Sequence, residues 1–312
     1  MANGDCARGA ENAANIRGRR GDGSTMPRLS MIPAWMPEEV TRYISVSLPG
    51  DCRMQCPYCL SGAHTRTGLP RVRPYSDEVV VAAWRQVAEN VGPCMLAVNG
   101  LEPTTELRLL GEVCAQHYAT IITNLQCCLR KFRAALDPER VEVHPSFHAH
   151  GWRSLDTFLA RIYRLRADGY RVPLVAIVAY PPYIPRLAEW AARLEAEGIW
   201  PNIVAMRNAT YQGREYPEGY TDDEREALSR WCSFESVHAP VPREIMCRAG
   251  IDACCVWFDG RVTRCGSMAA SAADDDMGNL YEDGHIRWLT EEHPCPIGYC
   301  PCGQLHALHV EP

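Results

Sequence analysis

Three cysteines stand within eight residues, and their types and spacing suit the binding of a metal cluster. Cys52, Cys56 and Cys59 form a C-x3-C-x2-C pattern shortly after an apolar run. Three thiolates from one loop can bind three irons of a cubane [4Fe–4S] cluster, which leaves the fourth iron open to an outside ligand. A structural zinc site with a missing ligand is the alternative, although zinc sites usually pair C-x2-C units.

The loop resembles the cluster loop of the radical SAM superfamily, including the aromatic Tyr58 directly before the third cysteine. The resemblance implies that S-adenosylmethionine (SAM) binds the open iron. It implies further that an external reductant, such as a flavodoxin or a ferredoxin, drives SAM cleavage to a 5′-deoxyadenosyl radical.

Strands and helices alternate through the chain that follows. Apolar and β-branched runs predict six strands, and amphipathic runs predict helices between them. Alternation of this kind implies parallel strands joined by right-handed crossovers. Six units make an α/β fold with a partial (βα)6 barrel, whose active site is expected at the carboxyl ends of the strands. The predicted strands are residues 41–47, 94–98, 119–123, 141–147, 172–180 and 199–206.

Several polar residues follow these strands and resemble SAM-binding motifs. The stretch Asn99 to Pro103 resembles the superfamily's GGEP motif, with Asn99 in place of the first glycine, and Thr123-Asn124 resembles its T-N-G segment. His148 and His150 are candidate substrate contacts or surface-turn residues without a role. The resemblance implies the following SAM-binding residues: Tyr58, Asn99, Gly100, Glu102, Thr123, Asn124, Ser146 and Arg207.

The C-terminal part holds a second set of cysteines. Asp259-Gly260 between apolar runs predicts a β-hairpin, which would bring Cys247 and Cys265 close together. This arrangement resembles the twitch and SPASM domains, and it implies one auxiliary [4Fe–4S] cluster. A zinc ribbon is the alternative. Five thiols compete for its four ligand positions: Cys247, Cys265, Cys295, Cys300 and Cys302.

Cys254 and Cys255 are adjacent in the first strand of the predicted hairpin. Neighbouring strand residues face opposite sides, so one thiol should point to the core or cluster and the other toward the barrel mouth. A weak S–H bond can return a hydrogen atom to a carbon radical, which makes both thiols candidate catalytic residues. The remaining cysteines in strands and helices, Cys94, Cys114, Cys127, Cys128 and Cys232, are interpreted as packing.

Composition limits the class of protein. The chain has 312 residues, 16 of them cysteine, a net charge of −6 and a pI of about 5.9. This charge argues against nucleic acid as a partner. The sequence contains no run of about 18 apolar residues, so we expect no membrane span. Residues 1–35 lack periodicity and a secretory leader, so we expect disorder there. Residues 36–240 should form the barrel and 241–312 the twitch-like domain, in a cytoplasmic protein whose thiols stay reduced.

The chain is similar to the neomycin epimerase family of aminoglycoside biosynthesis in its length, its single auxiliary cluster and its spare thiols. The resemblance implies that a hydrogen atom is removed from a sugar carbon of a cationic aminoglycoside and returned by a thiol to the opposite face. One alternative is a radical SAM dehydrogenase that oxidises an aminocyclitol alcohol to a ketone and passes an electron to the auxiliary cluster. A peptide-modifying radical SAM enzyme is the other.

Overall fold

The structure is a computed structural model. It describes residues 17–19, 25–27, 29, 31–48, 52–59, 74–232, 245–266, 277–295 and 309–310. Among these residues, no helix is both long and apolar enough to cross a membrane.

Six parallel strands form the centre of the molecule, in the order in which they occur in the chain. They are β3 (Tyr43–Leu48), β4 (Met95–Gly100), β5 (Tyr118–Thr123), β6 (Val141–Pro145), β7 (Leu174–Ala179) and β8 (Trp200–Ala205). The first four share one sheet, and β7 pairs with β8. Two parallel bridges, Glu142 to Arg171 and Ser146 to Ala176, continue the sheet from β6 to β7. The predicted α/β class with a parallel central sheet is confirmed.

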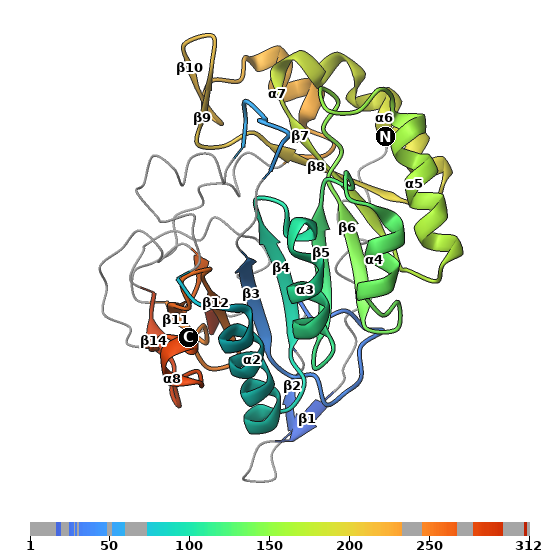
Figure 1. Cartoon of the computed structure of the whole chain (residues 1–312). Coiled ribbons are helices and arrows are strands. Elements are labelled where there is room, and N and C mark those ends of the chain that lie inside the picture. The colour runs from blue at the N-terminus through green and yellow to red at the C-terminus, as the bar shows by residue number, and fades with distance from the viewer. Residues whose placement is uncertain are drawn as a thin grey trace.

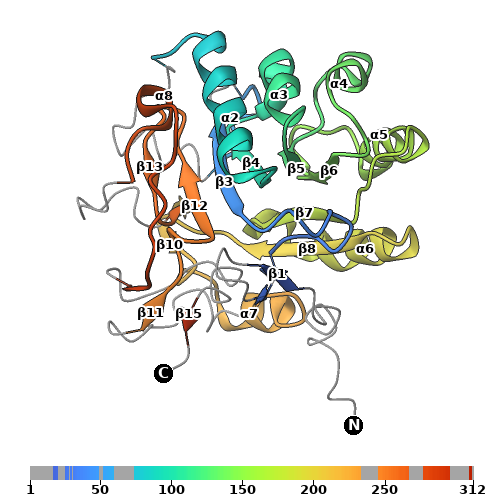
Figure 2. The same cartoon turned by 90° about the horizontal axis from the view of Figure 1, so that it is seen from below.

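Helices cover the outer face of the curved sheet, as Figures 1 and 2 show. Serine and threonine N-caps begin three of them: Ser76 accepts from Val79 N, Ser154 from Thr157 N, and Thr221 from Glu224 N. The helices are α2 (Asp77–Val91), α3 (Leu107–Cys114), α4 (Leu129–Ala135), α5 (Leu155–Ala167), α6 (Ile184–Ala196) and α7 (Asp222–Leu228), with short 3-10 turns η1 (Pro103–Glu106) and η2 (Pro181–Tyr183).

The main core lies between these helices and the sheet. Alternate residues of β3, namely Ile44, Val46 and Leu48, are buried there together with the large rings of Trp84 and Trp190. The intervening residues of each strand therefore face the concave side of the sheet. We call this concave side the lumen face; its residues include Ser45, Asn99, Thr120, Glu142, His144, Ser146 and Cys255.

The C-terminal part extends the barrel sheet. Strand β12 (Ala253–Val256) pairs in parallel with β3, and it pairs antiparallel with β13 (Val262–Thr263) around the turn at Asp259-Gly260. Turn residues predict a local hairpin but carry no information on the strand beside which it lies. The domain boundary expected at residue 241 is therefore bridged by a continuous sheet.

Short elements complete the described part of the chain. Strands β9 (Ala209–Tyr211) and β10 (Arg214–Tyr216) form a hairpin, and β11 (Met246–Cys247) pairs with both β14 (His293–Pro294) and β15 (His309–Val310). Helix α8 (Leu280–Asp283) follows the β13 region, and β1 (Arg17–Arg19) pairs with β2 (Thr25–Pro27).

The segment before β3 closes one end of the barrel. Ile32, Met36 and Val40 are buried in an apolar cluster with Met95 and Ala97 of β4. The expectation of disorder over residues 1–35 is therefore wrong for residues 31–35. The physical reason is that their few apolar side chains cover the lumen face, a contact that the lack of periodicity does not reveal.

A buried histidine links α2 to β4 and predicts a pH dependence of stability. His117 Nε2 donates to Trp84 O at 3.0 Å, and Nδ1 accepts from Cys94 N at 3.1 Å. Burial lowers the pKa of His117 from 6.5 to about 4, because the charged ring would be desolvated. The neutral ring thus stabilises the fold fully above pH 6.5, and this contribution is lost as the pH falls toward 4.

We expect the free energy of unfolding to fall by about 1.4 kcal/mol per pH unit in this window for His117 alone. Burial lowers the pKa of His148 to about 4 as well, so both rings contribute to the slope. Urea unfolding of the native chain and of His117→Gln between pH 7 and 4 measures it. The variant should lose about half of the histidine-dependent slope; an unchanged slope would contradict this role.

Candidate cluster-binding site

The thiol loop lies directly beyond the carboxyl end of β3. Cys52, Cys56 and Cys59 are all partly buried, and Cys59 N donates to Cys56 O at 3.1 Å in a tight turn. Asn124, which follows β5, donates from Nδ2 to Cys52 Sγ at 3.6 Å. The loop therefore lies over the strand ends, as the sequence predicts.

The loop favours protonated thiols until a metal binds. Burial raises the pKa of Cys56 to about 12, and the neighbouring Cys59 and Cys52 thiols raise it further in the same direction. Burial also raises the pKa of Cys52. Metal binding would therefore have to displace protons from thiols that already interact with one another.

The donor set of the loop is three thiols, which is the set that a cubane cluster with one open iron requires. In the part of the chain that the structure describes, no three Cys, His, Asp or Glu side chains converge closely enough for one metal ion. Electrostatic interactions link the three thiols of the loop. The residues present therefore fit a [4Fe–4S] cluster with one open iron.

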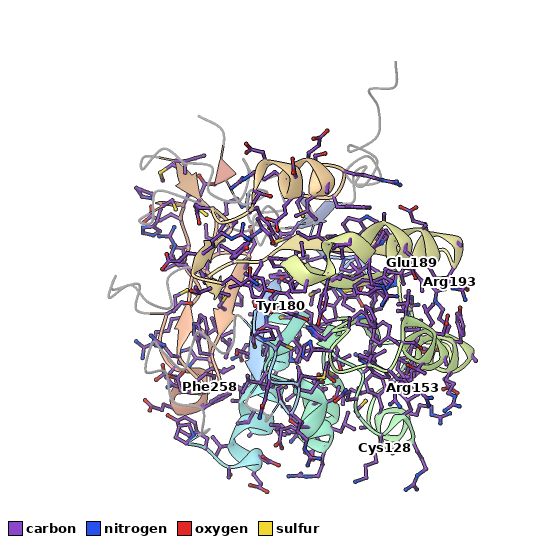
Figure 3. All side chains as sticks on the ribbon, turned by 90° about the horizontal axis from the view of Figure 1, so that it is seen from above. Cys128, Arg153, Tyr180, Glu189, Arg193 and Phe258 are labelled. Atoms are coloured by element: carbon purple, nitrogen blue, oxygen red, sulfur yellow. The ribbon has the colours of Figure 1, made fainter. Side chains whose placement is uncertain are left out.

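Aromatic and histidine side chains hold the loop in place. Tyr58 is buried, and its ring lies 5.1 Å from that of Tyr180 and 5.8 Å from that of His148. The Tyr58 hydroxyl and His148 Nδ1 share a hydrogen bond of 3.1 Å. Seen from above, Tyr180 lies toward the middle of the molecule, whereas Arg153 and Glu189 lie at its periphery (Figure 3).

His150 connects the loop to the segment after β7. Its Nε2 donates to Met54 O at 3.1 Å, and its Nδ1 lies 3.0 Å from the Tyr183 hydroxyl. The two histidines, which were candidate substrate contacts, thus contact the thiol loop and its supporting tyrosines.

Glu102 joins the ends of β4 and β5. Its Oε1 accepts from the hydroxyls of Thr104 at 2.5 Å and Thr123 at 2.7 Å, and its Oε2 accepts from Asn124 N at 2.7 Å. Glu102 as a whole is only 6% exposed. This network aligns two of the predicted SAM-binding segments with each other, and it brings Thr123, Asn124 and Glu102 into direct contact.

Gly100 lies where β4 approaches the end of β3. Its φ is +125°, and an added Cβ would lie 2.7 Å from Leu48 O, which is a backbone atom. We expect Gly100→Ala to lower the free energy of unfolding by about 2–4 kcal/mol through strain and overpacking. Urea unfolding measures this loss.

Gly284 provides the matched control for Gly100. It ends α8 with φ +70°, and a Cβ added there would have no neighbouring atom within 4 Å. Gly284→Ala should cost only the left-handed strain, about 1 kcal/mol. Equal losses in the two variants would contradict the close approach at Gly100.

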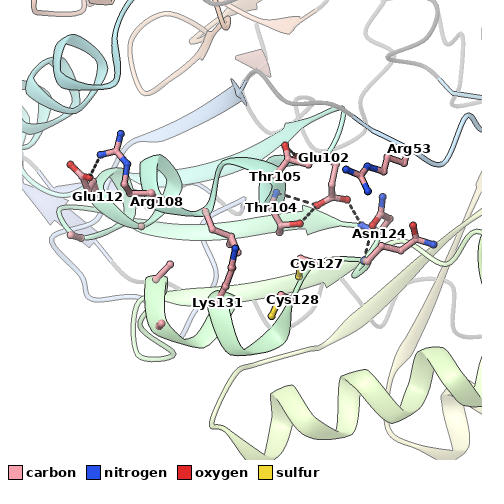
Figure 4. Close-up of a pocket in the computed structure, with 16 residues that line it drawn as sticks. Arg53, Glu102, Thr104, Thr105, Arg108, Glu112, Asn124, Cys127, Cys128 and Lys131 are labelled. Atoms are coloured by element: carbon pink, nitrogen blue, oxygen red, sulfur yellow. Dashed lines mark hydrogen bonds and ion pairs between the residues drawn. The ribbon is translucent and has the colours of Figure 1, made fainter.

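A groove of about 1150 Å³ begins beside the loop and runs outside the barrel between α3 and α4 (Figure 4). Arg53, Glu102 and Asn124 line one end, and Lys131 and Cys128 line its α4 side. Cys128 is exposed, so the interpretation of this thiol as packing is wrong. It is the N-cap of α4, where backbone N–H groups lower the pKa of Cys128.

Two of the other predicted SAM-binding residues, Asn99 and Ser146, lie on the lumen face. Asn99 Nδ2 donates to Ser45 Oγ at 2.9 Å, which places both side chains there. Ser146 follows β6 on the same face, and its backbone N donates to Thr123 O at 2.8 Å. Arg207 follows β8 and interacts electrostatically with Cys232.

The described thiols of the C-terminal part partly converge. Cys247 and Cys265 border one apolar cluster, and the Cys295 thiol contributes to raising the pKa of Cys247, for which burial is the larger cause. Arg264 is 3% exposed and donates to Ala249 O and His293 O, at 2.9 and 3.0 Å, which ties β13 to β14. Cys300 and Cys302 lie outside the described residues, so the auxiliary cluster remains a prediction.

Cys254 and Cys255 face opposite sides of β12. Cys254 is 2% exposed in the main core, and it pairs with Ile44, which faces the helices. Cys255 pairs with Ser45 and therefore lies on the lumen face. The expected division of the two thiols is present, and it leaves Cys255 as the thiol nearer to the barrel interior.

Two polar residues of β6 were missed by the sequence interpretation. Glu142 is 6% exposed, and its Oε1 lies 2.7 Å from His144 Nε2. The alternation Glu142, His144, Ser146 within an otherwise apolar strand was the signal that could have found them, because a strand buried on both faces would be apolar throughout.

The fold and the loop define a class of protein: a partial parallel barrel with a three-thiol loop at the carboxyl end of its first barrel strand. No protein-family model and no curated protein matches the sequence. Among solved structures, the chain is similar to a histidine-tagged form of anSMEcpe with bound AdoMet, with a TM-score of 0.52 and 13% identity over 77% of this chain and 75% of that one. This likeness shows a shared fold.

A second similar structure is BtrN in an open conformation, with a TM-score of 0.33 and 13% identity over 77% of this chain and 76% of that one. At this TM-score the overlap is too poor to support an argument.

Proposed function

We propose that the chain is a radical SAM enzyme. The observation that carries this proposal is the position of Cys52, Cys56 and Cys59 at the carboxyl end of β3, beside Asn124. The fold shared with an AdoMet-bound protein supports the same conclusion. A [4Fe–4S] cluster on the three thiols, with SAM on its open iron, would supply a 5′-deoxyadenosyl radical that removes hydrogen from an unactivated C–H bond.

The residues of this chain would place SAM against the substrate. Glu102 keeps the ends of β4 and β5 together, and Tyr58 with His148 and His150 fixes the loop. The buried Tyr58 and the partly buried Tyr180 and Tyr183 would exclude water from a reactive intermediate. An external one-electron reductant, such as a flavodoxin or a ferredoxin, is the protein partner that this chemistry requires.

We propose further that the reaction is the epimerisation of a sugar carbon in a cationic aminoglycoside. After hydrogen is removed from that carbon, Cys255 would return a hydrogen atom to the opposite face, so that the C–H bond forms and the S–H bond breaks. The resulting thiyl radical at Cys255 would need one electron and one proton, with the electron coming from the external reductant. Cys255 is favoured because it lies on the lumen face, whereas Cys254 lies in the core.

Anaerobic reconstitution with iron and sulfide tests the proposal. The protein should become brown, bind about four irons per cubane, and cleave SAM when dithionite is added. Two cubanes would give about eight irons and would support the auxiliary cluster. A colourless protein, or SAM left intact under reductant, would overturn the radical SAM assignment and favour a zinc-binding module.

A further inference from the structure

The lumen face of β6 carries an acid–base pair that the thiol loop does not use. Val141 and Val143 are buried against the helices, so Glu142 and His144 project from the opposite face of the strand. Their side chains meet, with Glu142 Oε1 2.7 Å from His144 Nε2. The pair therefore faces the same interior as Cys255.

The strand register places Glu142 and Cys255 at the two ends of one row of residues. Cys255 pairs with Ser45, Ser45 with Ala97, Ala97 with Thr120, and Thr120 with Glu142. Paired residues of parallel strands point to the same face, and four strand spacings amount to roughly 19 Å along the sheet. Because the sheet is curved, as Figure 2 shows, both ends of the row lie on its concave side.

The lumen face differs on the two sides of this row, below it toward the amino ends of the strands and above it toward their carboxyl ends. Below it, Met36 and Val40 cover Ala97 with apolar side chains. Above it, Ile122 pairs with His144 and is 40% exposed, although it belongs to a central strand of the sheet. Apolar side chains therefore cover the lumen face below the row, and solvent reaches Ile122 beside His144, toward the strand ends over which the thiol loop lies.

His144 is the more exposed member of the pair. The side chain of Glu142 is 8% exposed and that of His144 is 23% exposed. Within the described residues, His144 is the hydrogen-bond partner of the Glu142 carboxylate. A buried carboxylate is costly unless a positive charge or several donors compensate it. One imidazole N–H offsets only a small part of the cost of burying the Glu142 carboxylate, and a ligand cation would offset more of it.

We infer that Glu142 and His144 bind a protonated amino group of the substrate, at the end of the lumen opposite Cys255. His144 Nε2 donates to Glu142, which leaves Nδ1 as an acceptor for an ammonium or hydroxyl group of the ligand. Glu142 holds the ring and supplies the negative charge. The inference rests on the proposed function in one respect only, namely that the ligand in this lumen is the substrate.

Direct binding tests the pair without any turnover. The probes are 2-deoxystreptamine, a hydroxylated ring with two amino groups, and scyllo-inositol, a similar ring with hydroxyls alone. Calorimetry with the anaerobically reconstituted full chain should show tighter binding of the amine. Glu142→Gln keeps the shape of the side chain and removes its charge, so it should weaken amine binding by roughly ten- to a hundredfold and leave inositol binding nearly unchanged.

Glu139→Gln is the matched control. Glu139 is exposed and stands in the turn before β6, so the same change in charge occurs outside the lumen. Amine affinity should stay at the native value in this variant. Equal amine affinity in Glu142→Gln and the native chain would overturn the inference, and so would a native chain that binds the amine no better than inositol.

SAM cleavage by dithionite in the same samples separates this inference from the proposed function. Glu139→Gln should cleave SAM at the native rate in the absence of substrate, because the exposed Glu139 lies outside the lumen. A native chain that binds the amine but leaves SAM intact would refute the radical SAM assignment and retain the binding pair. A native chain that cleaves SAM but does not select the amine would refute the binding pair and retain the radical SAM assignment.

Discussion

Replacing Cys255 by alanine should abolish epimerisation and leave the first half of the reaction intact. The variant should still convert SAM to 5′-deoxyadenosine when the substrate is present, since the thiol acts only after hydrogen has been removed. Formation of the epimer should fall by roughly a hundredfold or more, because no hydrogen donor would remain on the far side of the substrate carbon. Liquid chromatography with mass detection of both products measures the two halves separately.

Cys254→Ala is the control next to it in the chain. Cys254 pairs with Ile44 in the main core and is 2% exposed, so it cannot approach a ligand in the lumen without unfolding of β12. This variant should lose about 1 kcal/mol of stability from the smaller core side chain and keep epimerisation. In deuterated water the native enzyme should place one deuterium on the inverted carbon, since a thiol exchanges its hydrogen with solvent.

Three results would contradict this role of Cys255. Full epimerisation by Cys255→Ala would assign the hydrogen donor to another group. Loss of activity in Cys254→Ala at unchanged stability would reverse the assignment of the two thiols. A ketone product from the native enzyme, unaffected by either substitution, would favour the dehydrogenase alternative.

The barrel could be predicted from the sequence because a local pattern of residues indicates each of its strands and helices. The predicted strand at residues 119–123 appears as Tyr118–Thr123, and the one at 141–147 as Val141–Pro145. Boundaries moved by one or two residues, since strand ends depend on hydrogen bonds to neighbours. The region between β4 and β5 holds two elements, the 3-10 turn η1, which begins at Pro103, and the helix α3.

Contacts between distant segments could not be predicted in the same way. The pairing of β12 with β3 joins residues about 210 positions apart, and nothing local in Cys254 or Ser45 specifies the partner. Residues 31–36 are similar: their apolar side chains are too few to show a period, yet they cover the floor of the lumen. The role of His150 in holding Met54 O depends on the same kind of distant contact.

Loss of one thiol from the loop should have the largest effect of all on the chemistry. Cys56→Ala removes the thiol whose pKa burial raises to about 12, and with it one of three attachments to the cluster. A cubane held by two thiolates should not survive purification, so we expect about four irons fewer per chain than in the native protein. SAM cleavage under dithionite should fall below ~0.1% of the native rate, since no open iron remains to bind SAM.

Cys128→Ala is the control for the loss of a thiol as such. Cys128 is exposed at the start of α4 and lies on the groove, outside the loop. Iron content and SAM cleavage should both match the native protein in this variant. If Cys56→Ala kept its iron and its SAM cleavage, the loop would not hold the cluster; if Cys128→Ala lost them, the groove and not the loop would carry the chemistry.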